Sequence, residues 1–132
     1  MEKKGIIMDT LNKMGYNPIQ DEDGDVLFYH QMKAIYVMVD DEDESYVSLM
    51  LPQFNEVEEG NEALVLAVCN KMTRELKMAK VYIDKNFKNV TCTCEFYYAN
   101  EESLVQNLTN SLKLLGIIRT LYREEYAEMQ EE

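Results

Sequence analysis

Apolar residues recur with two different periods along this chain, which predicts a mixture of helices and strands. Three segments place them three and four residues apart, the pattern of a helix with one buried face. These segments are residues 2–14, 59–77 and the region from Ser103 onward. The segments between them alternate apolar and polar residues or are rich in β-branched and aromatic residues, as strands are. The predicted strands are residues 26–30, 34–39, 46–51, 81–84 and 90–98, with a further extended stretch at 16–20.

Turn and capping residues mark the ends of these elements. Gly15 is a good stop for the first helix, and Gly24 can take positive φ in the polar turn Asp21–Asp25. Pro52 ends the strand that precedes it, and Ser103 is the expected N-cap of the last helix. Short turns join most neighbouring strands, which favours antiparallel pairing.

The order of elements predicts an α+β fold: helix, three or four strands, helix, two strands, helix. Helices that come between runs of strands pack mainly on one face of an antiparallel sheet. A chain of 132 residues suits one domain, and the sequence has no internal repeat, low-complexity stretch or linker. We therefore expect a single domain over residues 1–132.

The two faces of the predicted sheet differ in chemistry. One is aliphatic and should lie under the helices; its residues are Ile35, Val37, Val39, Val47, Leu49, Leu51, Val81, Ile83, Val90, Cys92, Cys94 and Phe96. The other alternates with it and collects the adaptable contact residues tyrosine and methionine; these are Tyr36, Met38, Tyr46, Met50, Tyr82 and Tyr97. This second face is either half open to water or a contact surface for a partner.

The last helix also carries more apolar residues than one buried stripe needs. Leu114, Ile117 and Leu121 form a second row beside its main stripe. A helix that is apolar over a wide arc is deeply buried or covered by another chain. Because deep burial on two sides is difficult in so small a domain, this row is a second candidate surface for an oligomer contact.

The charge of the chain restricts its partners. It has 25 acidic and 13 basic residues, a formal net charge of -12. Sequence-independent nucleic-acid binding and docking on anionic lipid both need clustered cations, so neither is expected. No apolar run approaches the roughly 20 residues of a membrane span. At the N-terminus Asp9 interrupts the apolar stretch and no small-residue cleavage site follows, so we expect no signal peptide.

The cysteines are expected to be buried thiols in a reducing cytoplasm. There are three, Cys69, Cys92 and Cys94, and an odd number without a secretion signal fits that compartment. Cys92 and Cys94 lie two apart on a predicted strand and share its aliphatic face, where they serve as small apolar residues. A metal or redox site would have to recruit Cys69 and His30 from distant segments.

Patterns that carry chemistry are weak in this sequence. A calcium loop that began at Asp21 would need glycine sixth and glutamate twelfth, but Gly24 falls fourth and Met32 twelfth. There is no glycine-rich phosphate cradle and no nucleophile elbow. We therefore expect no catalytic residue, metal or cofactor.

The sequence also allows an alternative function. Cys94 and His30 could meet in space and, with carboxylates such as Glu95 and Asp84, form a small-ligand site or an enzyme active site. Nothing in their spacing along the chain favours such an arrangement. It is the second hypothesis for function.

The segment from Asn70 to Asp84 resembles the central signature of the YbjN-like family, bacterial domains labelled as sensory transduction regulators. In that family a helix with an internal asparagine leads into a strand of the type Lys80–Asp84. The Asp21–Asp25 turn, the strands at 34–40 and 46–52 and the helix from Ser103 fit the rest of the pattern. The resemblance implies the fold of type III secretion chaperones, which are commonly dimeric and bind extended effector segments. It brings no catalytic residues.

Together these observations predict a non-catalytic, cytoplasmic protein-interaction module, chaperone-like or regulatory. The implied partner is another protein, with a homodimer as a further expectation.

Overall fold

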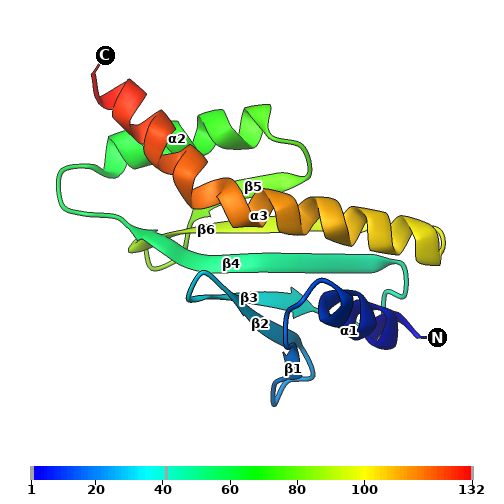
Figure 1. Cartoon of the computed structure of the whole chain (residues 1–132). Coiled ribbons are helices and arrows are strands. Elements are labelled where there is room, and N and C mark those ends of the chain that lie inside the picture. Colours follow the sequence, from blue (N-terminus) through cyan, green and yellow to red (C-terminus); the bar gives the residue numbers. More distant parts are fainter. Residues whose placement is uncertain (1, 41, 132) are drawn as a thin grey trace.

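The computed structural model describes residues 2–40 and 42–131; Met1, Glu132 and Asp41 of the acidic loop lie outside them. The chain folds into three helices and six strands (Figure 1). In order they are α1 (Lys3–Lys13), β1 (Ile19–Gln20), β2 (Val26–His30), β3 (Lys33–Met38), β4 (Tyr46–Glu56), α2 (Glu62–Glu75), β5 (Ala79–Ile83), β6 (Asn89–Tyr97) and α3 (Glu101–Gln130).

The strands form one antiparallel sheet in the order β1-β2-β3-β4-β6-β5, which confirms the predicted α+β class. The 30-residue α3 runs across the sheet and continues past α2 (Figure 1). α2 contacts β5 and α3, and α1 contacts α3. In the described part of the chain, no helix has both the length and the apolar character that a membrane span requires.

The core lies between the helices and the aliphatic face of the sheet, as the strand pattern predicted. Val37, Leu49 and Cys94 form one cross-strand row, and all three are fully buried. Leu11 of α1 and Leu108 of α3 are fully buried in the same core cluster. Burying each such large side chain contributes roughly 1.5–3 kcal/mol, which offsets the entropy lost on folding.

The sequence predicted that the strand from Tyr46 ends at Pro52, and this prediction is wrong. Strand β4 extends to Glu56. Its pairing with β6 shifts between Leu51 and Asn55, so β4 carries extra residues at a bulge. The ladder between β3 and β4 has already ended at Met50. Proline has no N–H to donate to a ladder, and it is tolerated in a strand at bulges and along unpaired edges.

Two helices start at different residues from those expected. The N-cap of α3 is Asn100: its side chain accepts a hydrogen bond from the Ser103 N–H, and the Ser103 hydroxyl accepts one from the Asn100 N–H. Ser103 is thus the third helical residue of a capping box and not the cap itself. Helix α2 starts at Glu62 and not at residue 59, because Gly60 has a φ of 94°, outside the helical range.

Candidate functional site

The Tyr and Met residues predicted to share one sheet face do lie together on the face away from the helices. Tyr36 pairs with Met50 across β3 and β4, and Tyr46 pairs with Tyr97 across β4 and β6. The rings of Tyr46 and Tyr97 have centroids 5.4 Å apart. We call this surface the open face; its residues are Tyr36, Met38, Tyr46, Met50, Tyr82 and Tyr97.

A polar network crosses the open face. The Glu95 carboxylate forms an ion pair with Lys80 and accepts a hydrogen bond from the Tyr46 hydroxyl, and these contacts hold its pKa below the usual value. Burial, together with the bond to Glu95, raises the pKa of Tyr46 to about 12. Beside it the Tyr82 and Thr93 hydroxyls lie 2.7 Å apart. The Glu95 carboxylate is therefore occupied by contacts with Lys80 on β5 and Tyr46 on β4.

The second candidate surface, on α3, is separate from the open face. Leu114 and Leu121 are half-buried against the core, whereas Ile117 is 53% exposed. α3 lies on the opposite side of the sheet, because the residues it buries face the aliphatic core. The nine predicted contact residues thus divide between two surfaces.

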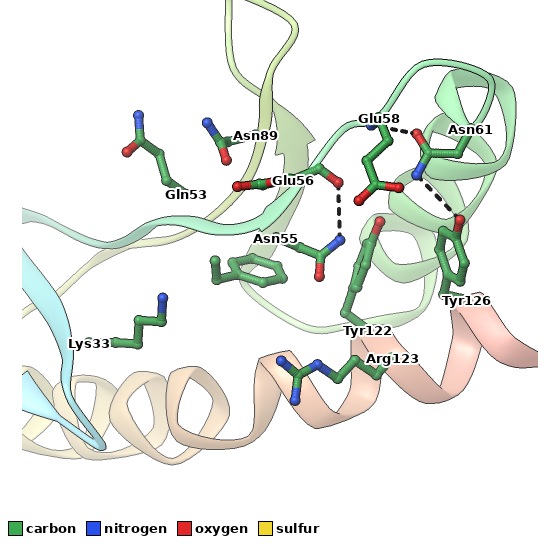
Figure 2. Close-up of a pocket in the computed structure, with 11 residues that line it drawn as sticks. Lys33, Gln53, Asn55, Glu56, Glu58, Asn61, Asn89, Tyr122, Arg123 and Tyr126 are labelled. Carbon is green, nitrogen blue, oxygen red and sulfur yellow. Dashed lines mark hydrogen bonds between the residues drawn. The ribbon is translucent and has the colours of Figure 1, made fainter.

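A cleft of about 580 Å³ lies where β4 bends toward α2, between that strand and the last third of α3 (Figure 2). The residues that line it are Lys33, Gln53, Phe54, Asn55, Glu56, Glu58, Asn61, Asn89, Tyr122, Arg123 and Tyr126. The sequence pattern does not predict this site, because its residues come from five separate segments and are mostly polar. Pro52 was a signal for it, since proline there marks a place where the ladder ends.

Tyr122 forms the buried wall of the cleft. The residue is 1% exposed, and its ring packs edge-on against Phe54 with centroids 5.6 Å apart. Its hydroxyl is buried and has no hydrogen-bond partner among residues 2–40 and 42–131, although the Asn55 side chain lies close by. Burial raises the pKa of this hydroxyl, so it stays protonated and can donate a hydrogen bond.

Charges of both signs line the cleft, and Glu56 on β4 lies between its two ends (Figure 2). Lys33 enters from β3 and Arg123 from α3, whereas Glu58 lies at the other end beside Asn61, as Figure 2 shows. The Asn61 side chain accepts a hydrogen bond from the Glu58 N–H (2.8 Å) and donates one to the Tyr126 hydroxyl (3.3 Å). Such side-chain amides and unpaired charges suit a polar ligand with hydrogen-bonding groups along its length.

The structure does not bring together the residues of the alternative hypothesis. Cys94 lies on β6 and His30 on β2, three strands away, which is roughly 14 Å at the usual spacing. His30 instead lies against Gly116, and its Nδ1 is 3.2 Å from the Tyr16 hydroxyl. All three cysteines are free and buried; burial raises the pKa of Cys69 to about 11, whereas the hydrogen bond with Cys92 lowers the pKa of Cys94. Cys69 is therefore a poor nucleophile, and Cys94 is fully buried and lies apart from the imidazole that would have to act with it.

The acidic run Asp21–Asp25 is a turn, as predicted. The Asp21 carboxylate accepts hydrogen bonds from the N–H groups of Asp23 and Asp25, both at 2.9 Å, and Gly24 has a φ of 86°. Among residues 2–40 and 42–131, no three His, Cys, Asp or Glu side chains are placed to hold one metal ion.

Solved structures share this fold. The crystal structure of YbjN from E. coli is 10% identical, with a TM-score of 0.64 over 88% of this chain and 87% of that one. An uncharacterized protein from Methanothermobacter thermautotrophicus is 12% identical, with a TM-score of 0.58 over 93% of this chain and 98% of that one. At these identities the likeness concerns the fold alone. No curated protein matches the sequence.

A family model covers almost the whole chain. The model for the T3SS (YopN, CesT) and YbjN peptide-binding chaperones, group 1, matches residues 2–125. This match spans every strand and most of α3. It agrees with the resemblance seen in the Asn70–Asp84 segment and with the fold of YbjN. The chain therefore belongs to the family of T3SS and YbjN peptide-binding chaperones.

Proposed function

We propose that this protein binds a segment of another protein, as a chaperone-like or regulatory module that acts without catalysis. The observation that carries this proposal is the match of residues 2–125 to a family of peptide-binding chaperones. The structure adds two surfaces of suitable chemistry, the open face and the cleft beside β4. The buried thiols and the distance between Cys94 and His30 remove the main support for an enzyme.

Selection from a random peptide library on the immobilised full chain tests this function. We expect families of related peptides to be enriched, and the corresponding synthetic peptides to bind the chain in solution. Isothermal titration calorimetry then measures their affinity. If repeated selections enrich no sequence above an immobilised unrelated acidic protein, the chain is not a peptide-binding module.

We also propose that the chain works in the cytoplasm as a homodimer that pairs through the open face. The three free, buried cysteines suit a reducing compartment. On the open face, Tyr97 is 67% and Tyr82 36% exposed, and aromatic residues of this kind are enriched at protein interfaces. The net charge of -12 disfavours nucleic acid and anionic membranes as partners.

Light scattering on two matched variants tests the dimer. Tyr97→Lys places a charge on the open face and should lower the mass from that of a dimer to that of a monomer. Ile117→Lys changes another exposed large residue, on α3, and should leave the mass unchanged. A monomer mass for the unmodified chain at high micromolar concentration would contradict this proposal without affecting peptide binding.

A further inference from the structure

On the side where β3 lies, the second half of β4 has no paired strand in the described part of the chain. The β3 ladder on β4 ends at Met50, while β4 itself continues to Glu56. β3 begins at Lys33, directly after the turn Gln31–Met32. Both turn residues have positive φ, and the turn reverses the chain so that β3 pairs antiparallel with β2. In the described part of the chain, no strand therefore pairs with β4 on this side beyond Met50.

This edge presents peptide groups to the cleft that no strand pairs with in the described part of the chain; the Glu56 carbonyl accepts one hydrogen bond, from the Asn55 side-chain amide at 3.3 Å (Figure 2). The N–H of Val57 donates to the carbonyl of Lys88 at 2.7 Å, and Asn55 is paired with β6 as well. Since alternate residues of an antiparallel strand direct their peptide groups to opposite sides, those of Phe54 and Glu56 face away from β6. Phe54 and Glu56 both line the cleft. An unpaired strand edge is a template on which another extended chain can add.

The wall opposite this edge points to the same kind of ligand. Within the described part of the chain the buried Tyr122 hydroxyl has no hydrogen-bond partner, and such groups are rare in folded proteins. The side-chain amides of Asn55 and Asn61 lie beside it in Figure 2. A ligand that brings its own hydrogen-bonding groups, as an extended peptide does, would satisfy this hydroxyl.

The charges at its two ends give the cleft a direction, with Glu56 on β4 between them (Figure 2). Lys33 lies at the end where β3 begins, with Arg123 on the α3 wall, and Glu58 lies at the opposite end (Figure 2). Among the described residues, none of these three side chains forms an ion pair with another. A chain that enters in line with β3 runs antiparallel to β4, as β3 does. Its amino end would then lie near Glu58 and its carboxyl end near Lys33.

We infer that the cleft binds an extended segment of a client protein as an added strand, antiparallel to β4 and in line with β3. The segment carries a basic residue toward Glu58, at its amino end, and a carboxylate toward Lys33 and Arg123, at its carboxyl end. This inference rests on the proposed function, because it specifies where and in what orientation a peptide binds.

Peptides of reversed sequence test the orientation. The probes are the capped peptide Lys-Thr-Val-Thr-Val-Glu and its reverse, each titrated into the ¹⁵N-labelled full chain. We expect the first to bind about tenfold more tightly, because its charges match both ends of the cleft. Shifts should concentrate at the amides of Phe54, Glu56 and Arg123. An uncapped Lys-Thr-Val-Thr-Val with a free carboxyl terminus tests whether a chain end supplies the carboxylate as well as a side chain does.

Strand addition makes a further demand on the peptide backbone. N-methylation of alternate residues removes every N–H on one edge of the peptide. Methylation of the odd-numbered residues and methylation of the even-numbered residues give two peptides. One of them should lose binding and the other should keep it, because only one edge of the peptide faces β4. Equal loss in both peptides, or none in either, would overturn strand addition.

Variants of the chain test the cleft itself. Lys33→Glu combined with Glu58→Lys should reverse the preference between the two peptides. The control is Asp9→Lys combined with Lys13→Glu, which inverts an exposed ion pair on α1 and should leave the preference unchanged. Tyr122→Phe keeps the ring and removes only the unpartnered hydroxyl, so binding should weaken while the melting temperature does not fall.

The failure of this inference is distinguishable from failure of the proposed function. If the titrated peptides shift only residues of the open face, or the two orders bind equally, the cleft site is wrong while peptide binding stands. If library selection also enriches nothing, peptide binding fails as well.

Discussion

Gly116, midway along α3, lies directly against the imidazole of His30 at the end of β2. A Cβ atom built on Gly116 would be 3.2 Å from Nε2 of His30. The ring is also held from the other side, where its Nδ1 lies 3.2 Å from the Tyr16 hydroxyl. Glycine at this position therefore lets the longest helix approach the sheet where β2 ends, close to the start of β3.

Gly116→Ala should reveal this contact. Alanine favours a helix interior over glycine by about 1 kcal/mol, but here its methyl group would press on His30. We expect little change in the free energy of unfolding in the unmodified chain and a gain of about 1 kcal/mol in a His30→Ala background. Urea denaturation of the four chains of this double-mutant cycle measures the difference. Equal effects in the two backgrounds would show that the contact costs nothing.

The capping box of α3 should contribute to stability. Asn100→Ala removes the acceptor for the Ser103 N–H, 2.9 Å away, and should lower the free energy of unfolding by about 1 kcal/mol. Asn110→Ala, at an exposed position inside the same helix, is the matched control. It should be neutral or slightly stabilising, since alanine is the better helix former. The cap has no such role if both substitutions give the same denaturation midpoint.

The ion pair on the open face should make stability depend on pH. Because contacts with Lys80 and Tyr46 hold the pKa of Glu95 below its usual 4.5, the folded chain keeps this carboxylate ionised more readily than the unfolded chain. The stabilisation is therefore present above pH 4.5 and is lost as the pH falls through the lowered pKa. Glu95→Gln should cost at most about 1 kcal/mol at pH 7, since the pair lies at the surface.

Denaturation of both chains at a series of pH values checks this prediction. The difference in stability between Glu95 and the Gln variant should shrink as the solution becomes acidic and vanish once the carboxyl is protonated. A difference that stays constant across this range would mean that the amide disturbs the sheet for a reason other than charge.

The two sides of α3 should differ sharply in sensitivity. Leu108→Ala empties a fully buried position and should cost about 2–5 kcal/mol. Ile117→Ala changes a residue that is 53% exposed on the same helix and should cost less than about 1 kcal/mol. Thermal and urea denaturation compare them. A large loss at Ile117 would show that another chain covers this side of α3 in solution.

Much of the fold followed from local patterns. The alternation in Val90–Phe96 predicted which residues face the helices, because a strand has only two faces and the aliphatic one must be buried. The limits of β4 were harder, since Pro52 is an ordinary strand stop. A bulge, together with the end of the β3 ladder at Met50, lets β4 continue through Pro52. Neither feature can be read from the residues of β4 alone.

The sequence by itself determined three properties of this protein: the order of helices and strands, the buried face of the sheet, and the membership of a peptide-binding family. They depend on periodicity and on residues close together in the chain. Tertiary structure alone decided that His30 lies against Gly116 and not beside Cys94, and that Lys33, Glu58 and Tyr122 line one cleft. These groupings join residues far apart in the sequence, and they depend on strand order and on the point at which one ladder ends.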